Sequence, residues 1–417
     1  MMSGGVDSSV AAFLLAKNKK YKVVGCFIKG YNVDGCQEAD AEDARRVAGF
    51  LKIPFYAIDL EKEYKKLVVD YMISGYKKGI TPNPDVMCNK EIKFGLFLEK
   101  ALEMGADYVA TGHYVGLASR YISDGTGRRL APAASRGLDS RSDGADFVGD
   151  QARRSSETFR TKHTEKLANN YSLFISKDKN KDQSYFLWTL TQKQSKHCLF
   201  PIGDYLKSEV REIARKAGLP TAEKKDSQGI CFLGMVKFKD FLKQYLPVKK
   251  GDVLLALSSA EGKTIYKKIG EHEGAWFYTI GQRHIGSNLQ FPISNLLKNR
   301  KPLYVVEKDI KKNILTVAEG ENNPALYKNE IYLQNVNFIN QQLTTDDQQL
   351  VYVRVRYRQP LIKARIMNNE SRIKDRPIIH NSKFIIQFDA PVKFVAPGQS
   401  AVFYNKKGEM LGGGIII

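Results

Sequence analysis

The segment that most restricts what this chain can fold into is residues 3–9, with the sequence SGGVDSS. It stands directly before residues 8–17, whose pattern predicts a helix. At the positive end of a helix, successive backbone N–H groups and hydroxyls can surround a pyrophosphate. A Gly-Gly pair can also be only a tight turn, but the full S-G-G-x-D-S string favours a phosphate-binding loop. The start of the chain therefore predicts a nucleotide-binding α/β domain.

The same loop indicates which bond of ATP would be cleaved. It lacks the G-K-[ST] ending of the Walker P-loop and is similar to the PP-loop of ATP pyrophosphatases. Those enzymes cleave ATP between the α- and β-phosphates and leave an adenylylated intermediate. Asp7 could help to hold Mg²⁺ on the phosphates. We therefore expect ATP and Mg²⁺ at this loop.

Helix and strand patterns alternate from residue 10 to about residue 117. Strands are expected at 22–29, 54–60 and 107–111, and helices at 38–51 and 90–104. Such alternation predicts a Rossmann-like parallel sheet with helices on both faces. A nucleotide loop normally follows a strand, yet only Met1 and Met2 precede this one, so the expected first strand is missing.

The rest of the chain changes in style. Residues 118–170 are rich in Arg, Ser, Gly and Asp, lack periodicity, and are predicted to be a mobile insertion. Helical pattern returns at 207–217 and 238–245, and from about residue 301 alternating segments predict an antiparallel β-barrel. We therefore predict three domains: a catalytic PP-loop domain at 1–233, a small central domain at 234–298 and a C-terminal β-barrel at 299–417.

Charge and hydropathy suggest a partner and a compartment. Lys and Arg exceed Asp and Glu by 20, enough to attract a polyanion such as nucleic acid, although a generally basic composition would give the same surplus. No run of eighteen apolar residues occurs, and no signal segment precedes the loop. A cytoplasmic protein without membrane contact is expected.

The number and spacing of the five cysteines leave packing or thiol chemistry as their possible roles. They are an odd number and form no C-x-x-C pair, which argues against a disulfide framework, a zinc ribbon or an iron–sulfur cluster. Cys26 and Cys198 lie among apolar neighbours and are expected in the core, and Cys36 has an uninformative context. Cys88 and Cys231 remain as candidates for catalysis.

Both remaining cysteines have settings that suit catalysis. Residues 81–89, TPNPDVMCN, contain two stiffening prolines and place Asp85 three residues before Cys88. Asp85 could act as general acid or base and Cys88 as nucleophile or resolving thiol; a buried structural cysteine is the alternative. Cys231 follows a flexible Ser-Gln-Gly turn, which suits a thiolate that moves between a sulfur donor and a substrate.

Motifs along nearly the whole chain, apart from the 118–170 insertion, resemble the bacterial and organellar tRNA-specific 2-thiouridylase family. In order they are SGGVDSSVAA, TPNPDVMCNKEIKFG, ATGHY, KDQSYFL, DSQGICFLG, YTIGQR, VRYRQP and APGQSAVFY. The resemblance implies that ATP adenylylates O2 of the wobble uridine and that a persulfide sulfur then attacks C2. The chemistry is reasonable, because the uracil oxygen is a poor leaving group until it is esterified and AMP is a good one.

The resemblance also assigns roles to single residues. Cys231 would carry the persulfide, Cys88 would attack it and leave a transient Cys88–Cys231 disulfide, and Asp85 would be the acid or base. Thiol exchange of this kind needs no iron–sulfur cluster. The sulfur would come from an upstream persulfide carrier or a cysteine desulfurase. The implied ATP-binding residues are Ser3, Gly4, Gly5, Val6, Asp7, Ser8, Ile28 and Gly112; for Ile28 an apolar core role explains the residue equally well.

A further set of residues is implied to bind tRNA. Asn83, Pro84 and Asp85 would frame the flipped-out base, and the others are His113, Lys181, Asp182, Gln183, Arg356, Tyr357 and Gln399. Simpler roles compete: His113 could cap a strand, and Asp182 or Ser184 could start a helix. Alternation along VRVRYRQ predicts Arg354, Arg356 and Arg358 on one strand face, suited to RNA phosphates.

Two other functions stay open from the sequence. Another PP-loop ATPase acting on a small molecule would share residues 3–9, but the two motif-placed cysteines argue against it. A tRNA-binding protein with impaired catalysis would explain the missing first strand and the insertion.

Overall fold

The protein is described by a computed structural model. It describes residues 1–33, 35–121, 169–225, 229, 231–234, 236–258, 264–283, 285, 301–339, 349–368 and 384–417. Most of the predicted insertion lies outside these residues. Its two ends do not lack structure: β4 (Gly116–Tyr121) and β5 (Asn169–Phe174) form an antiparallel pair in continuous register. The predicted bounds of the insertion, 118 and 170, were therefore wrong, because they include residues of both strands.

The N-terminal domain has the predicted alternating order. Its principal elements are α1 (Val6–Lys17), β1 (Gly25–Lys29), α2 (Cys36–Phe50), β2 (Phe55–Asp59), β3 (Val109–Ala110), β6 (Cys198–Leu199) and α8 (Lys207–Lys216). β1 pairs with β2 and β3 pairs with β6, both in parallel. The Met2 amide donates to the Cys26 carbonyl at 2.7 Å and the Met1 amino group to the Ala110 carbonyl at 2.7 Å. These two residues thus bridge β1 and β3, where the sequence led us to expect the first strand.

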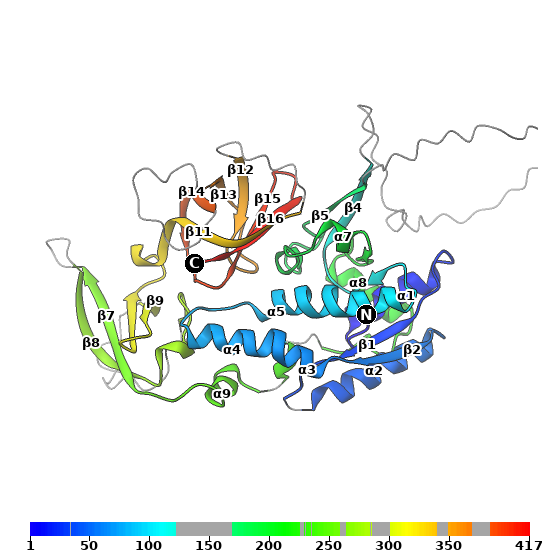
Figure 1. Ribbon diagram of the computed structural model, residues 1–417, viewed down its shortest axis with the longest axis horizontal. Helices are drawn as coiled ribbons and strands as arrows, with labels where there is room; N and C mark the ends of the chain where they lie inside the picture. Colours follow the sequence, from blue (N-terminus) through cyan, green and yellow to red (C-terminus); the bar gives the residue numbers. More distant parts are fainter. Residues whose placement is uncertain are drawn as a thin grey trace, which may run out of the picture.

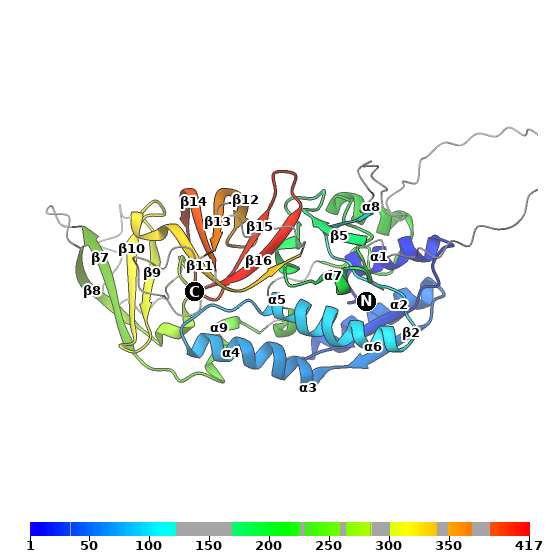
Figure 2. The ribbon, with the colours of Figure 1, turned by 45° about the horizontal axis from the view of Figure 1, so that its top comes forward.

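Two long helical stretches leave this domain and lie side by side beneath the barrel (Figures 1 and 2). The first comprises α3 (Glu61–Tyr64), the π-helical η1 (Lys65–Val69) and α4 (Asp70–Lys77). The second comprises α5 (Pro84–Met87), the π-helical η2 (Cys88–Leu96) and α6 (Phe97–Glu103). The first was not predicted, and the second begins earlier than the helix expected at 90–104.

The central domain is a four-stranded sheet. Its strands β7 (Gly251–Ser258), β8 (Thr264–His272), β9 (Leu303–Asp309) and β10 (Ile314–Glu319) follow the order β8-β7-β10-β9. The prediction placed residues after 299 in the barrel. β9 and β10 instead pair with the central sheet, because alternation marks a strand but not its partner.

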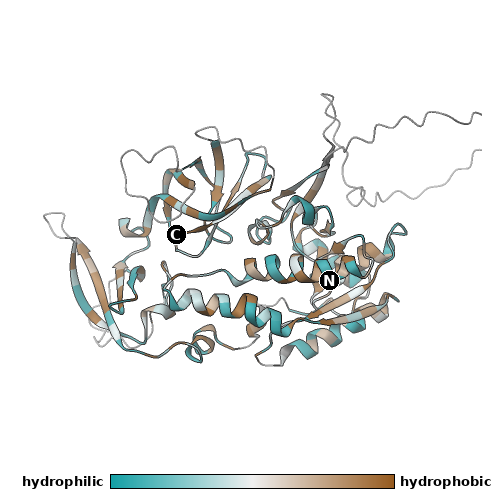
Figure 3. Cartoon of the chain, in the orientation of Figure 1, coloured by the Kyte–Doolittle hydropathy of each residue, from teal (hydrophilic) through white to brown (hydrophobic). Residues whose placement is uncertain are grey.

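The C-terminal domain is the predicted closed antiparallel barrel. Its strands are β11 (Tyr327–Phe338), β12 (Gln349–Arg354), β13 (Ile362–Asn368), β14 (Phe384–Lys393), β15 (Ser400–Tyr404) and β16 (Met410–Ile416). They close in the order β11-β14-β13-β12-β15-β16. Apolar and polar stretches interleave along these strands (Figure 3). The barrel therefore begins at Tyr327, not near residue 299.

Short elements complete the connections between the domains. They are the 3₁₀ segments η3 (Ser184–Phe186), η4 (Cys231–Leu233), η5 (Ala275–Phe277) and η6 (Pro324–Leu326), and the helices α7 (Gln192–Ser195) and α9 (Phe238–Lys243). Trp188 Nε1 donates to Ser400 Oγ and the Tyr185 hydroxyl donates to the Ser400 carbonyl, both at 2.9 Å. These buried bonds fix the barrel to the catalytic domain.

Candidate active site

The loop at residues 3–8 has the conformation of an anion-binding turn. Gly4 adopts a left-handed φ of 71°, and a Cβ there would collide with the Asp40 carbonyl oxygen. Ser8 Oγ accepts from the Ser3 amide at 3.1 Å and donates to the Gly5 carbonyl at 3.0 Å. α1 begins at Val6 and has no side-chain cap at Gly5, so its first-turn N–H groups point out of the helix end. This arrangement suits a phosphate at the helix terminus.

Asp7 is the charged centre of the loop. Its carboxylate accepts two bonds from Lys207 Nζ, at 2.7 and 2.9 Å, and one from the Tyr114 hydroxyl at 2.8 Å. Mg²⁺ usually binds proteins through one or two carboxylates plus phosphate oxygens, so an ion at Asp7 would have to share this carboxylate with Lys207. Lys207 and Tyr114 were not predicted as site residues, although Lys207 begins a helix that was predicted.

Gly112 packs directly against the backbone of the loop. It follows β3, and a Cβ at this position would lie 2.7 Å from the Asp7 carbonyl carbon and 2.7 Å from the Ser8 nitrogen. Only glycine permits the two backbones to come this close. Ile28, in β1, packs at the edge of the apolar cluster that contains Cys88.

Replacing Gly112 by alanine is expected to weaken ATP binding. The new methyl group must displace the loop backbone, and overpacking of this kind costs about 1–3 kcal/mol. Calorimetric titration with a non-hydrolysable ATP analogue measures the change in Kd. Gly49→Ala is the control, because Gly49 lies in α2 with no atom within 4 Å of its Cβ position. An unchanged Kd for Gly112→Ala would show that the loop tolerates displacement.

The segment before Cys88 is rigid, as its prolines predicted. Asn83 Oδ1 accepts from the Val86 amide at 3.2 Å and caps α5, with Pro84 in the first turn. The Thr81 amide donates to the Pro397 carbonyl at 2.7 Å, and Gln399 Nε2 donates to the Thr81 carbonyl at 2.9 Å. The barrel therefore holds the start of this catalytic segment, and Gln399 lies beside it.

Cys88 and Asp85 share a buried environment. Burial raises the pKa of Cys88, and the Asp85 carboxyl raises it further, whereas Lys93 and the Tyr64 hydroxyl act in the opposite direction. Burial also raises the pKa of Asp85, against the opposing charge of Lys93. A carboxyl with a raised pKa retains a proton nearer to neutral pH, as a general acid must.

Cys231 begins η4, and the side chain of Cys231 and residues 226–228 and 230 lie outside the described structure. The next residue, Phe232, is buried, and its ring centroid lies 5.8 Å from that of Tyr64 in an edge contact. Tyr64 also bonds the Cys88 thiol. The backbone that carries Cys231 thus packs on the residue that contacts Cys88. Tyr64 was not predicted as a site residue.

His113 is a buried neutral imidazole. Its Nδ1 lies 2.7 Å from Thr111 Oγ1, and its ring centroid lies 5.9 Å from that of Phe94. Burial lowers the pKa of His113 well below its ordinary value, with Lys93 acting in the same direction. A neutral ring can position a base by hydrogen bonding or stacking but offers no charge to phosphate.

The residues 181–183 have structural partners. The Asp182 carboxylate is buried, accepts from Arg354 Nη1 at 2.8 Å and accepts from the Ser184 amide at 3.2 Å. The alternative in which Asp182 or Ser184 caps a helix was wrong, because the N-cap of η3 is Gln183 and it has no side-chain cap. Gln183 Oε1 accepts from the Tyr114 amide at 3.0 Å, whereas Lys181 is only partly buried.

The prediction that three arginines share one strand face was wrong. β12 ends at Arg354, and the chain then turns, with Arg358 at a left-handed φ of 64°. Arg356 Nη2 instead donates to the Ile280 carbonyl at 2.9 Å. The Tyr357 ring lies 4.6 Å from that of Phe186. Period-two alternation describes side chains only while the strand continues.

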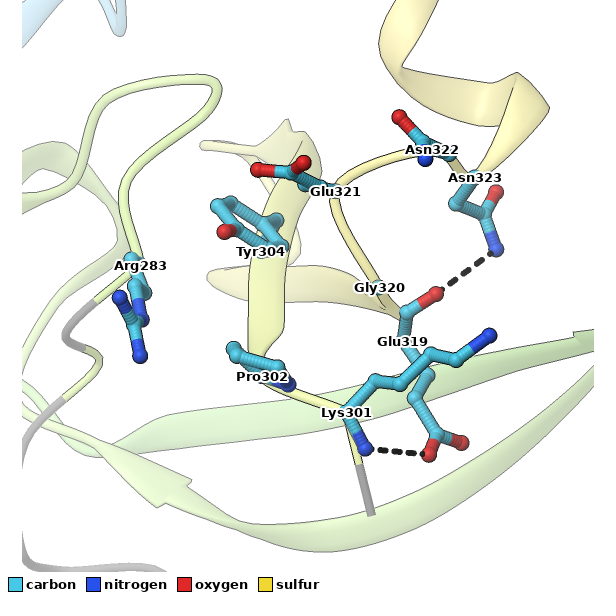
Figure 4. A pocket seen from close by; sticks show the side chains of 9 residues that line it. All are labelled: Arg283, Lys301, Pro302, Tyr304, Glu319, Gly320, Glu321, Asn322 and Asn323. Carbon is cyan, nitrogen blue, oxygen red and sulfur yellow. Dashed lines mark hydrogen bonds between the residues drawn. The ribbon is translucent and has the colours of Figure 1, made fainter.

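A separate hollow of about 490 Å³ lies in the central domain (Figure 4). Arg283, Lys301, Tyr304 and the turn at residues 319–323 contribute to its lining. None of its lining residues was a candidate for the site. The candidate residues lie elsewhere, at the phosphate loop and around Cys88.

The fold and the loop together define an ATP-binding α/β domain followed by two β domains, and three family models match the chain in this order. The tRNA methyl transferase HUP domain matches residues 1–150 and 148–235, the tRNA methyl transferase PRC-barrel domain 239–319, and the Aminomethyltransferase beta-barrel domain 328–416. The second match includes β9 and β10, in agreement with the observed sheet.

Curated relatives identify the particular family. The chain is 40% identical to the tRNA-specific 2-thiouridylase MnmA of Idiomarina loihiensis, over 100% of this chain and 94% of the relative. It is 41% identical to that of Bacillus licheniformis (100% and 93%) and 40% identical to that of Proteus mirabilis (100% and 95%). The chain belongs to the tRNA-specific 2-thiouridylase family. The resemblance seen in the motifs is confirmed.

One structural feature bears on location. In the ranges that the structure describes, no helix is both long enough and apolar enough to span a bilayer.

Proposed function

We propose that this chain is a tRNA-uridine 2-sulfurtransferase that uses ATP to thiolate the wobble uridine. The observation that carries the proposal is the meeting of the Cys88 and Cys231 segments at Tyr64, in the domain that holds the phosphate loop. Family membership supports it, because the relatives are named for this activity. Two cysteines placed in separate motifs argue against an ATPase for small molecules.

The first half-reaction would activate the base. Residues 3–8 and Gly112 would bind the phosphates of ATP, Ile28 would pack on the adenine, and Asp7 would hold Mg²⁺. The ion would neutralise phosphate charge when bound. The uridine O2 attacks the α-phosphorus, pyrophosphate leaves, and O2 becomes an adenylyl ester.

The second half-reaction would transfer sulfur. The Cys88 thiolate attacks Sγ of the Cys231 persulfide, so that a Cys88–Cys231 disulfide forms and hydrosulfide is released. Hydrosulfide attacks C2 and AMP departs with the C–O bonding electrons. Asp85 would move the protons. A thiol reductant then supplies two electrons to the disulfide.

The remaining assignments concern tRNA and the cellular setting. Asn83, Pro84 and His113 would surround the flipped base, and Lys181, Asp182, Gln183, Arg356, Tyr357 and Gln399 would contact the tRNA directly or order the residues that do. The surplus of 20 positive charges favours such a partner. The donor would be a persulfide carrier or a cysteine desulfurase, no iron–sulfur cluster is required, and the expected compartment is the cytoplasm.

The test is incubation of purified protein with unmodified tRNA, Mg-ATP and a persulfide donor. We expect tRNA-dependent pyrophosphate release and 2-thiouridine by mass spectrometry of the digested tRNA. Binding of tRNA without either product would support the catalytically impaired alternative. Pyrophosphate release that does not depend on tRNA would support the small-molecule ATPase.

A further inference from the structure

Lys93 is placed by an unusual turn of helix. It lies five residues after Cys88 in η2, the spacing that one π-helical turn places on the same side of the helix. The segment kinks at Gly95, whose φ of −96° and ψ of −106° are not helical and where a Cβ would lie 2.8 Å from the Lys90 carbonyl oxygen. Wide turns of this kind recur at functional sites. The motif therefore contains a second side chain directed to the same place as the thiol.

The surroundings of Lys93 connect three candidate residues. Its ammonium interacts electrostatically with Cys88, Asp85 and His113. The neighbouring Phe94 contacts the His113 ring at 5.9 Å, which sets this turn of η2 against the strand end that carries His113. Lys93 itself is only partly buried. It is thus a cation shared by the thiol, the acid and the imidazole.

The charges around Cys88 come from several elements. Tyr64 faces it from α3, Asp85 from α5 and Lys93 from η2. His113 interacts electrostatically with both Lys93 and the Met1 amino group, and burial lowers the pKa of the Met1 amino group to about 6. With His113 also neutral, Lys93 is the side chain among these described groups that carries positive charge at neutral pH.

A buried thiol next to a carboxyl is a poor nucleophile because the thiolate, not the thiol, attacks. A neighbouring ammonium favours the charged form and opposes both effects. We propose that Lys93 stabilises the Cys88 thiolate and so sets the rate at which Cys88 attacks the Cys231 persulfide. This inference rests on the proposed function for the identity of the sulfur acceptor and donor.

The first test measures Cys88 alone. Iodoacetamide modification of Cys88 is followed by peptide mass spectrometry between about pH 6 and pH 11.5, a span that extends above the ordinary thiol pKa because burial raises the pKa of Cys88. Lys93→Met is expected to move the midpoint upward by about one pH unit, which makes modification near pH 7 roughly tenfold slower. Lys93→Arg should keep the wild-type midpoint. If Lys93→Met is unfolded by circular dichroism, Lys93→Gln takes its place.

A matched control lies on the same helix. Lys90 is exposed and pairs with Glu91 at 2.7 Å, so Lys90→Met removes one positive charge without touching the site. It should behave as the wild type. A midpoint in Lys93→Met equal to that of Lys90→Met would overturn the inference. Because modification needs no tRNA, ATP or donor, this result stands whether or not the wild type thiolates tRNA.

The second test measures the effect of Lys93 on the rate of thiolation. Single-turnover thiolation by Lys93→Met should fall by roughly tenfold near pH 7 and approach the wild-type rate as the pH rises, since alkali restores the thiolate. A packing defect would lower the rate equally at every pH. A loss that does not shrink at high pH therefore also contradicts the inference.

Discussion

Replacing either Cys88 or Cys231 by serine is expected to abolish 2-thiouridine formation and to leave tRNA-dependent pyrophosphate release intact. Serine preserves the size of the side chain but can carry no persulfide and form no disulfide. In the proposed mechanism, activation of the uridine would depend on residues 3–8 and Gly112, which lie on other elements. Pyrophosphate release and thiolation are measured in the same reaction. The pair of variants thus separates the two half-reactions.

Cys198 provides the control for this experiment. Its thiol is buried in β6 and donates to the Gln194 carbonyl at 3.2 Å, and burial raises its pKa to about 12. A thiol held neutral in this way is unreactive. Cys198→Ala should therefore retain thiolation. Loss of thiolation in this variant, or its retention in Cys88→Ser, would contradict the assigned roles.

The sequence predicted most of the fold because hydrophobic periodicity reports burial. The parallel strands and the barrel follow directly from it. The helical stretch at 61–77 was missed although Tyr64, Val68, Met72 and Tyr76 are buried at intervals of four. The β-branched residues in this stretch lower its helix propensity, and its π-helical turn departs from the period of an α-helix. Only the four-residue spacing of the buried side chains could have predicted this helix.

Candidate site residues could be predicted where a single motif carries them. Asp85 and Cys88 occur in one short segment, and Gly112 follows a strand end. Their partners could not be found in this way, since Lys207 reaches Asp7 across 200 positions of sequence. Only the folded sheet brings such groups together. Lys93 is different: it lies in the motif, and its meaning depends on a π-helical register that sequence periodicity does not reveal.

Replacing Arg354 by methionine is expected to destabilise the contact between barrel and catalytic domain. Arg354 Nη1 lies 2.8 Å from the Asp182 carboxylate, and the two side chains are 8% and 0% exposed. Removing one partner of a buried ion pair strands the other charge and costs about 3–5 kcal/mol. Urea unfolding can be followed by the fluorescence of Trp188, which bonds Ser400 of the barrel. Trp276→Phe as background leaves Trp188 as the single tryptophan, because the chain has two.

One control variant and one double variant test whether Asp182 acts through the ion pair with Arg354. Lys177 and Glu209 form an exposed pair, so Lys177→Met should cost less than about 1 kcal/mol. Adding Asp182→Asn to Arg354→Met should recover part of the lost stability, because a buried amide needs no counter-charge. If Arg354→Met costs no more than Lys177→Met, the pair does not hold the barrel. If Asp182→Asn weakens tRNA binding at unchanged stability, the Asp182 carboxylate contacts tRNA directly. Because this carboxylate is buried, we expect the opposite result: tRNA binding is lost only when the contact between the barrel and the catalytic domain is lost.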